Sequence, residues 1–134
     1  MGPEFPALIS DIKVVTADWP VIVVDTSDNL TDGELIDFLE KYDAFMQEQN
    51  QRHAVVVDLK RTKRMPSRQR KMITDSMSKR NEYTKQFSAC TALVFESAVM
   101  RGMLMAIFWI VKPAYPTKVF NSRKEAVAWC QTML

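Results

Sequence analysis

The sequence predicts an α/β domain with a mostly parallel sheet of about five strands and four helices, in the order β-β-α-β-α-β-α-β-α. Short runs rich in Val and Ile alternate with segments whose apolar residues recur at helical spacing. After the first two strands every strand is followed by a helix, which requires crossover connections and therefore parallel strands. With 134 residues, of which 47% are apolar, the chain can bury one core.

The opening residues, MGPEF at 1–5, resemble the remnant of a fusion or cloning site, so the predicted single domain spans residues 6–134. Its first two strands, Ile12–Ala17 and Val21–Thr26, are β-branched runs joined by a short turn, as in a hairpin. A capping box of Thr31 and Glu34 then opens a helix over about Asp32–Gln49.

The middle of the chain predicts a buried strand and a surface helix. Ala54–Leu59 is nearly continuous Val, which is typical of a central strand covered on both faces. Pro66 suits the first turn of the following helix and Ser67 suits a cap, and this helix is expected to continue to about Lys85. Its apolar stripe is thin, so it should lie on the surface.

The last third of the chain predicts two more strands and two more helices. Ser88–Phe95 reads as a strand, and Ala98–Val111 as a helix that is apolar on nearly every side. Two prolines, at 113 and 116, prevent that helix from continuing. A short strand at Lys118–Phe120 and a helix capped by Ser122 complete the fold.

Charge is distributed very unevenly along this chain. The segment 60–85 holds ten Lys or Arg and two acidic residues, a net charge of +8, whereas residues 1–59 carry −9 and residues 86–134 carry +3. The net charge of +2 for the whole chain is therefore the sum of strongly acidic and strongly basic segments. The basic segment begins where the central strand ends, which is where α/β proteins place their binding sites.

Three segments carry a resemblance to a known family: VVVDLK at 55–60, VMRGMLMAIFW at 99–109 and KVFNSRKEAVAW at 118–129. Together with the element order, they make residues 10–133 resemble the STAS fold of anti-sigma-factor antagonists. The chain looks most similar to the SpoIIAA-like branch, which is related in fold to CRAL-TRIO lipid-transfer domains. The resemblance implies a regulatory domain of bacterial origin.

The resemblance also implies a candidate phosphorylation site. In STAS antagonists a serine in an Asp-Ser-Ser-Gly-like segment at the start of the helix after the central strand is phosphorylated. The matching segment here is Met65-Pro66-Ser67-Arg68, which makes Ser67 the candidate phosphosite. This segment lacks the preceding acid and the following glycine of the family pattern.

Catalytic, metal and cofactor motifs are not found in the sequence. His53 is the only histidine, which argues against a zinc site. No Gly-x-Ser-x-Gly elbow is present and the three glycines are isolated, so neither a hydrolase nor a phosphate-binding loop is indicated. We therefore predict a protein that is not an enzyme and has no cofactor.

The cysteines, the apolar runs and the aromatic residues indicate where the protein acts and which partners are disfavoured. Cys90 and Cys130 are too few for a disulfide framework and are expected to be reduced core residues in the cytoplasm. The longest apolar run, at 102–111, is about half of what a membrane span needs. Few aromatic residues accompany the basic segment, which argues against nucleic acid.

Two groups of residues are candidate contact sites. The first is the predicted partner- or anion-binding cluster at the start of the second helix, where backbone N–H groups already favour anions; it consists of Arg61, Lys63, Arg64, Ser67, Arg68 and Lys71. The alternative is a solvated face that balances the acidic first helix. The second group is the apolar contact set Met103, Phe108 and Trp109 of the third predicted helix. One apolar face would be enough to bury this helix against the sheet, so its remaining apolar residues are expected to form an exposed surface that binds a partner or a ligand.

Two functional hypotheses follow. The first is a non-enzymatic regulatory or scaffolding module that binds a protein partner with an acidic face, or pairs as a homodimer, through both groups. The second is a carrier or sensor of an anionic lipid-like ligand, with the tail held by the third helix and the head by the basic loop. Contact with a membrane surface, without spanning it, is compatible with both.

Overall fold

The computed structural model describes residues 3–5, 12–63, 65–112 and 115–134. Five strands form one sheet in the order β1-β2-β3-β4-β5. β1 (Ile12–Val15) runs antiparallel to β2 (Val21–Ser27), and β3 (His53–Arg61), β4 (Ser88–Val94) and β5 (Thr117–Phe120) continue the sheet in parallel with β2. The predicted α/β class, the hairpin and the mostly parallel five-stranded sheet are confirmed.

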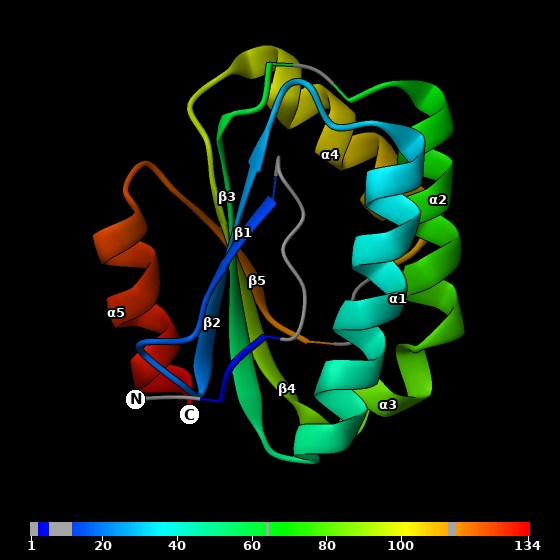
Figure 1. The fold of residues 1–134 in the computed structure, drawn as a ribbon. Helices are drawn as coiled ribbons and strands as arrows, with labels where there is room; N and C mark the ends of the chain where they lie inside the picture. Colours follow the sequence, from blue (N-terminus) through cyan, green and yellow to red (C-terminus); the bar gives the residue numbers. More distant parts are fainter. Residues whose placement is uncertain (1–2, 6–11, 64, 113–114) are drawn as a thin grey trace.

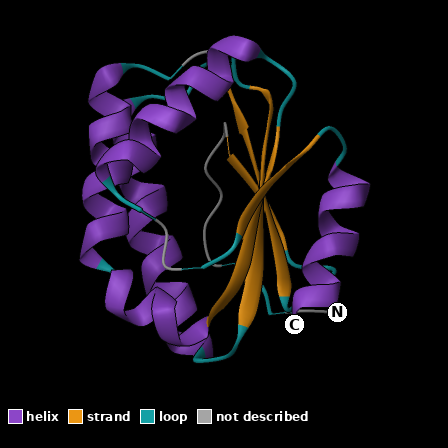
Figure 2. Cartoon of the chain, turned by 180° about the vertical axis from the view of Figure 1, so that it is seen from behind, coloured by secondary structure: helices purple, strands orange, loops and turns teal. Residues whose placement is uncertain are grey.

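Two helical layers cover the sheet unequally (Figures 1 and 2). α1 (Asp32–Gln49), α2 (Ser67–Lys79), α3 (Asn81–Phe87) and α4 (Ala98–Ile110) lie on one face, and α5 (Arg123–Met133) lies on the other. The sheet is therefore sandwiched between a layer of four helices and a single helix. β3 occupies the centre of the sheet and its first residues are buried, as its run of Val predicts.

The prediction of four helices was wrong by one, because the expected second helix is broken at Arg80. Arg80 has φ −104° and ψ 12°, so it closes α2 and also precedes α3. The break turns Tyr83 toward α1, where its hydroxyl donates to the carbonyl of Met46, and Tyr83 also packs against Phe87 with ring centroids 4.8 Å apart. Tertiary packing thus overrides the helical continuity that the local sequence permits.

Three of the predicted helix starts are confirmed by their caps. Thr31 and Glu34 form the full capping box of α1. The hydroxyls of Ser97 and Ser122 accept the third backbone N–H of α4 and α5. The predicted cap at Ser67 was wrong, because Pro66 occupies the cap position and the Ser67 hydroxyl accepts a hydrogen bond from Arg70 instead.

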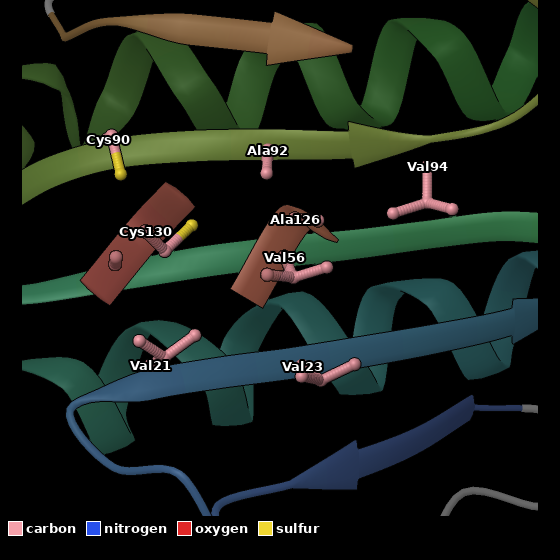
Figure 3. Close-up of a cluster of buried hydrophobic side chains, with 9 residues drawn as sticks. Val21, Val23, Val56, Cys90, Ala92, Val94, Ala126 and Cys130 are labelled. Atoms are coloured by element: carbon pink, nitrogen blue, oxygen red, sulfur yellow. The ribbon is translucent and has the colours of Figure 1, made fainter. Parts of the chain in front are cut away.

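α5 packs closely on its face of the sheet because small side chains separate them (Figure 3). The buried cluster on this side includes Cys90 and Ala92 from β4 and Ala126 and Cys130 from α5. Short side chains let the helix backbone approach the strands, and α5 lies near both β3 and β4. The expectation that both cysteines are free core residues is confirmed.

The opposite face is packed differently, in two separate clusters. One cluster, around Phe38 and Phe45, lies beneath α1. The other, around Phe95, Met100 and Leu104, lies beneath α4. α2 runs between them and packs on α1 and α4, but the only residues that it buries fully, within the part described, are Gln69 and Thr74. The middle of this face is therefore covered by a helix with little apolar surface.

Candidate ligand-binding cavity

A cavity of about 630 Å³ lies between the sheet and the layer formed by α1, α2 and α4. We call it the inter-layer cavity. Its volume falls within the range of about 300–1,000 Å³ that is usual for small-molecule sites.

Among the described residues, none of the helices combines the length and apolar content needed to cross a membrane.

The walls of the inter-layer cavity are mostly apolar. Alternate residues of three neighbouring strands form the floor, because successive side chains of a strand point to opposite faces; these are Val24, Val55, Val57 and Leu93. The roof comes from the three helices and comprises Leu35, Phe38 and Leu39 of α1, Ile73 and Met77 of α2, and Leu104, Ile107 and Phe108 of α4.

The composition of α2 explains why the described helices do not fill this space. Only Ile73 and Met77 reach from α2 toward the cluster beneath α4, and both stay partly exposed. Gln69 lies one turn before Ile73, and its side-chain amide is directed to the start of α1. It donates to the Leu30 carbonyl at 2.8 Å and to Asp32 at 3.1 Å. A helix whose inward face carries so few large apolar side chains cannot close the gap between the two clusters.

One end of the cavity lies at the carboxyl ends of β2 and β3. The hydroxyls of Thr26 and Thr62 share a hydrogen bond of 2.6 Å there. Arg68 forms an ion pair with Asp32 at the start of α1. That contact with Arg68, together with the Gln69 amide, lowers the pKa of Asp32, and the ion pair raises the pKa of Arg68. Charge at this end is therefore balanced within the chain.

The other end lies at the amino ends of β3 and β4, beside the break between α2 and α3. Its walls include Tyr42, His53, Arg80, Tyr83 and Ser88. The Arg80 guanidinium lies 5.4 Å from the centre of the Tyr42 ring and donates to the Ser76 hydroxyl at 2.6 Å. No carboxylate pairs with Arg80 within the part of the chain that the structure describes.

Burial keeps two of these polar groups uncharged. Desolvation raises the pKa of Tyr42 and lowers the pKa of His53. His53 Nδ1 lies 3.0 Å from the carbonyl oxygen of Gln51, which can only accept a hydrogen bond. The proton therefore sits on Nδ1, and Nε2 is an acceptor. Arg80 supplies the positive charge at this end.

The predicted basic cluster is assembled at one edge of the sheet, but much of its charge is already paired. Arg61 lies 3.1 Å from Asp25, Arg68 pairs with Asp32, and Lys71 lies 3.0 Å from Asp75. Lys63 is exposed, and its backbone N–H donates to Asp28. Arg64 lies outside the described residues. Three of the four described cations are thus partnered within the chain, although their side chains stay more than half exposed.

Ser67 lies at the exposed start of α2, between these cations. Its hydroxyl accepts a hydrogen bond of 2.9 Å from Arg70, which also donates to the Met65 carbonyl. An exposed hydroxyl at a helix start is sterically open to modification. Whether Ser67 is phosphorylated stays a prediction.

The three predicted apolar contact residues do not lie together. Trp109 is 89% exposed on the outer face of α4. Met103 and Phe108 are partly buried: the Met103 sulfur accepts the Met65 backbone N–H, and Phe108 lines the inter-layer cavity. The outer face of α4 is instead formed with Val99, Met105 and Ile110, each more than 60% exposed. We call these four exposed residues the outer α4 face.

Asp58 is partnered by α5 rather than by the basic loop alone. Arg123, the first residue of α5, donates from Nε to Asp58 at 3.0 Å and from Nη2 to Asp25 at 2.6 Å. Asp58 also accepts the Lys60 backbone N–H at 3.0 Å. Buried carboxylates held by an arginine in this way have a structural role.

The described part of the chain offers no cluster of metal ligands. Groups of three or more His, Cys, Asp or Glu that could hold a metal ion are not found there. Burial raises the pKa of both Cys90 and Cys130, so their reactive thiolate forms are disfavoured.

Arg80 is the cavity residue that the sequence-based reasoning missed. It belongs to the basic segment 60–85 and was counted there only as charge. The polar run Lys79-Arg80-Asn81 separates Met77 from Tyr83, but such a run is also typical of a continuous surface helix. The position of Arg80 inside the fold depends on the break between α2 and α3, which the sequence pattern did not indicate.

The comparisons with known proteins agree with this architecture. A crystal structure of an uncharacterised protein of the DUF3478 family from Shewanella loihica PV-4, described as having a SpoIIAA-like fold, superposes with a TM-score of 0.61. The match has 9% sequence identity and covers 89% of this chain and 91% of that chain, so it shows the fold. The predicted resemblance to the SpoIIAA-like fold is thereby confirmed.

Sequence comparison adds the family. No curated protein matches the sequence. A family model described as a domain of unknown function matches residues 39–134, which include α2, α3 and α4 above the inter-layer cavity. The chain therefore belongs to the DUF7793 family.

Proposed function

We propose that this protein is a non-enzymatic carrier or sensor that holds a small molecule with an apolar tail in the inter-layer cavity. The observation that carries the proposal is the cavity itself, about 630 Å³ between a floor of Val and Leu side chains and a roof of three helices. A space of this size and lining, left unfilled by the described residues, would forfeit the contacts that normally stabilise a core. An apolar chain would restore those contacts and gain the free energy of leaving water.

The roof of the cavity suits an adaptable ligand. Met77 contributes an unbranched side chain that can adjust its rotamer to the bound molecule. α4 lines the cavity with Leu104, Ile107 and Phe108 and exposes its opposite face. A ligand that contacts the inner side of α4 can therefore influence a surface on its outer side, which is what a sensor requires.

Filling the cavity should weaken binding of the ligand. We expect the double variant Val57→Phe with Ile73→Trp to weaken binding of dodecanoate by about tenfold or more, because the added rings occupy the space of the alkyl chain. Isothermal titration calorimetry of the purified protein measures this affinity, and burial of the chain should give a negative heat-capacity change.

The matched control makes the same two changes outside the cavity, at Val99→Phe and Ile36→Trp, both exposed positions. It should bind dodecanoate as the unaltered protein does. Equal binding by the cavity-filled and control variants, with both folded by circular dichroism, would contradict the proposal.

A second candidate function rests on the outer α4 face. We propose that this face binds a protein partner, in keeping with a regulatory or scaffolding role, because its four large apolar side chains are exposed on adjacent turns of one helix. Arg101 lies in the first turn of α4 and Lys112 lies just beyond its end, and both favour a partner with an acidic rim. Aromatic and Met residues are those enriched in interface cores.

The test of this second candidate compares Trp109→Ser with Ile36→Ser, a change of another exposed apolar side chain on α1. Trp109→Ser should lower self-association in sedimentation velocity, or retention of a co-purifying partner, while Ile36→Ser should not. Both should keep the free energy of unfolding within about 0.5 kcal/mol, since exposed sites tolerate substitution. Identical association of both variants would exclude the outer α4 face.

A further inference from the structure

We infer that Arg80 is the head-group site of the inter-layer cavity and that its ligand is an amphiphile with a single carboxylate, such as a long-chain fatty acid. This inference rests on the proposed carrier function and names its ligand class. It also moves the head group away from the basic loop at the start of α2 to the opposite end of the cavity.

The first observation is the pairing of the cationic residues that line the cavity. Arg68 is satisfied by Asp32, and His53 is kept neutral by burial. Arg80 is half-buried, lines the cavity and has no carboxylate partner among the described residues. Since charges removed from water are normally paired, an unpaired guanidinium at the wall of a cavity marks a place for an anion.

The second observation is the chemistry around Arg80. A guanidinium has five N–H donors, and the hydrogen bond to Ser76 uses one of them. The centre of the Tyr42 ring lies 5.4 Å from the guanidinium carbon, a cation–π contact that helps to hold the group in place. The acidic residues of the described cavity wall, Asp28 and Asp32, lie at the other end, beside the start of α1. Asp43 lies close enough to Tyr42 and Tyr83 to contribute to the rise in their pKa values. It does not line the cavity, however, and forms no ion pair with Arg80 among the described residues.

The third observation is the position of Arg80 relative to the apolar walls. Arg80 closes α2, one turn after Met77 and two turns after Ile73, and both of these residues line the cavity. A molecule whose head contacts Arg80 can thus extend its tail along α2 and over Val55 and Val57 of the floor. One cation matches one negative charge, which favours a carboxylate over a phosphate monoester.

Two probes with the same tail test this inference: dodecanoate, which is anionic, and 1-dodecanol, which is neutral. We expect Arg80→Met to weaken dodecanoate binding by about tenfold or more, because a hydrogen-bonded ion pair is lost, and to leave 1-dodecanol binding within about twofold. Arg80→Lys should restore part of the preference for dodecanoate, since it keeps the charge but loses the fork of donors.

Lys79→Met is the matched control, because Lys79 is the exposed neighbour that ends α2. It should change neither affinity. An equal loss for both probes in Arg80→Met would mean that Arg80 only supports the fold at the helix break, and would overturn the inference. Unchanged dodecanoate binding would overturn it as well. If the unaltered protein binds neither probe, the carrier function itself fails; if it binds both and only the Arg80 dependence is missing, the carrier function stands without this head-group site.

Discussion

Arg123 holds together the carboxyl ends of two strands and the start of α5. It bridges Asp25 of β2 and Asp58 of β3, whose partner positions in the parallel register bring both carboxylates to one place. Asp58 is buried and Asp25 nearly so. Without the Arg123 guanidinium, Asp58 would lose its charged partner beside a second carboxylate, Asp25, which would keep only Arg61.

We expect Arg123→Gln to lower the free energy of unfolding by about 1–3 kcal/mol, because it leaves a buried carboxylate without its charged partner. Partial exposure of Arg123 places the loss toward the lower end of that range. Urea denaturation measures it. Lys124→Gln, the adjacent exposed position, is the control and should change little; an equal effect of the two changes would contradict a specific role for Arg123.

Residue roles were predictable from sequence only where the partner is local. The caps at Thr31, Ser97 and Ser122 follow from neighbouring residues, and the structure confirms them. The partner of Asp58, by contrast, is Arg123, which lies 65 residues away in the chain. Pairings of this kind depend on the register of the sheet, which the sequence pattern does not specify.

At the scale of elements, α1 and α2 are joined through polar groups as much as through apolar ones. Asp32 at the start of α1 receives hydrogen bonds from both Arg68 and Gln69 at the start of α2. The strongly acidic first part of the chain thus meets the strongly basic middle part. The expectation that these charges balance each other applies to the Arg68–Asp32 pair.

This contact predicts a dependence of stability on pH. The pKa of Asp32 is lowered in the folded state, first by Arg68 and then by Gln69. Its stabilising contribution is therefore fully present above the unfolded-state pKa and is lost as the pH falls through the folded-state pKa. We expect Asp32→Asn and Arg68→Met each to flatten the fall in stability between neutral and acidic pH, measured by urea denaturation at several pH values. An unchanged slope in both variants would show that the contact contributes nothing.

Helix boundaries were predicted well where the sequence has a capping residue at the start of the helix or a proline after its end. The expected single helix up to Lys85 failed at Arg80, where neither Pro nor Gly announces a break. The cause lies in packing, since the turn lets Tyr83 reach the end of α1. The same break sets Arg80 against Tyr42, so the feature that the sequence concealed is also the one that shapes the candidate site.

At the scale of the molecule, the two faces of the sheet differ in how tightly helices pack on them. Small side chains bring α5 close to the sheet and leave that side well packed, with Cys90 and Cys130 buried in it. On the other side three helices pack on one another and enclose the inter-layer cavity. The carrier hypothesis placed an apolar tail against the third predicted helix and its head at the basic loop, but the volume and the lining of the cavity follow only from the assembled layers.

The central claim is that this cavity binds one apolar-tailed molecule. Native mass spectrometry of the purified protein with a small excess of dodecanoate tests it most directly, with the variant carrying Val57→Phe and Ile73→Trp measured beside it. We expect a single added mass of one dodecanoate on the unaltered protein and none on the filled variant. An unaltered protein that stays free of ligand, or that takes up the same series of ligands as the filled variant, would contradict the claim.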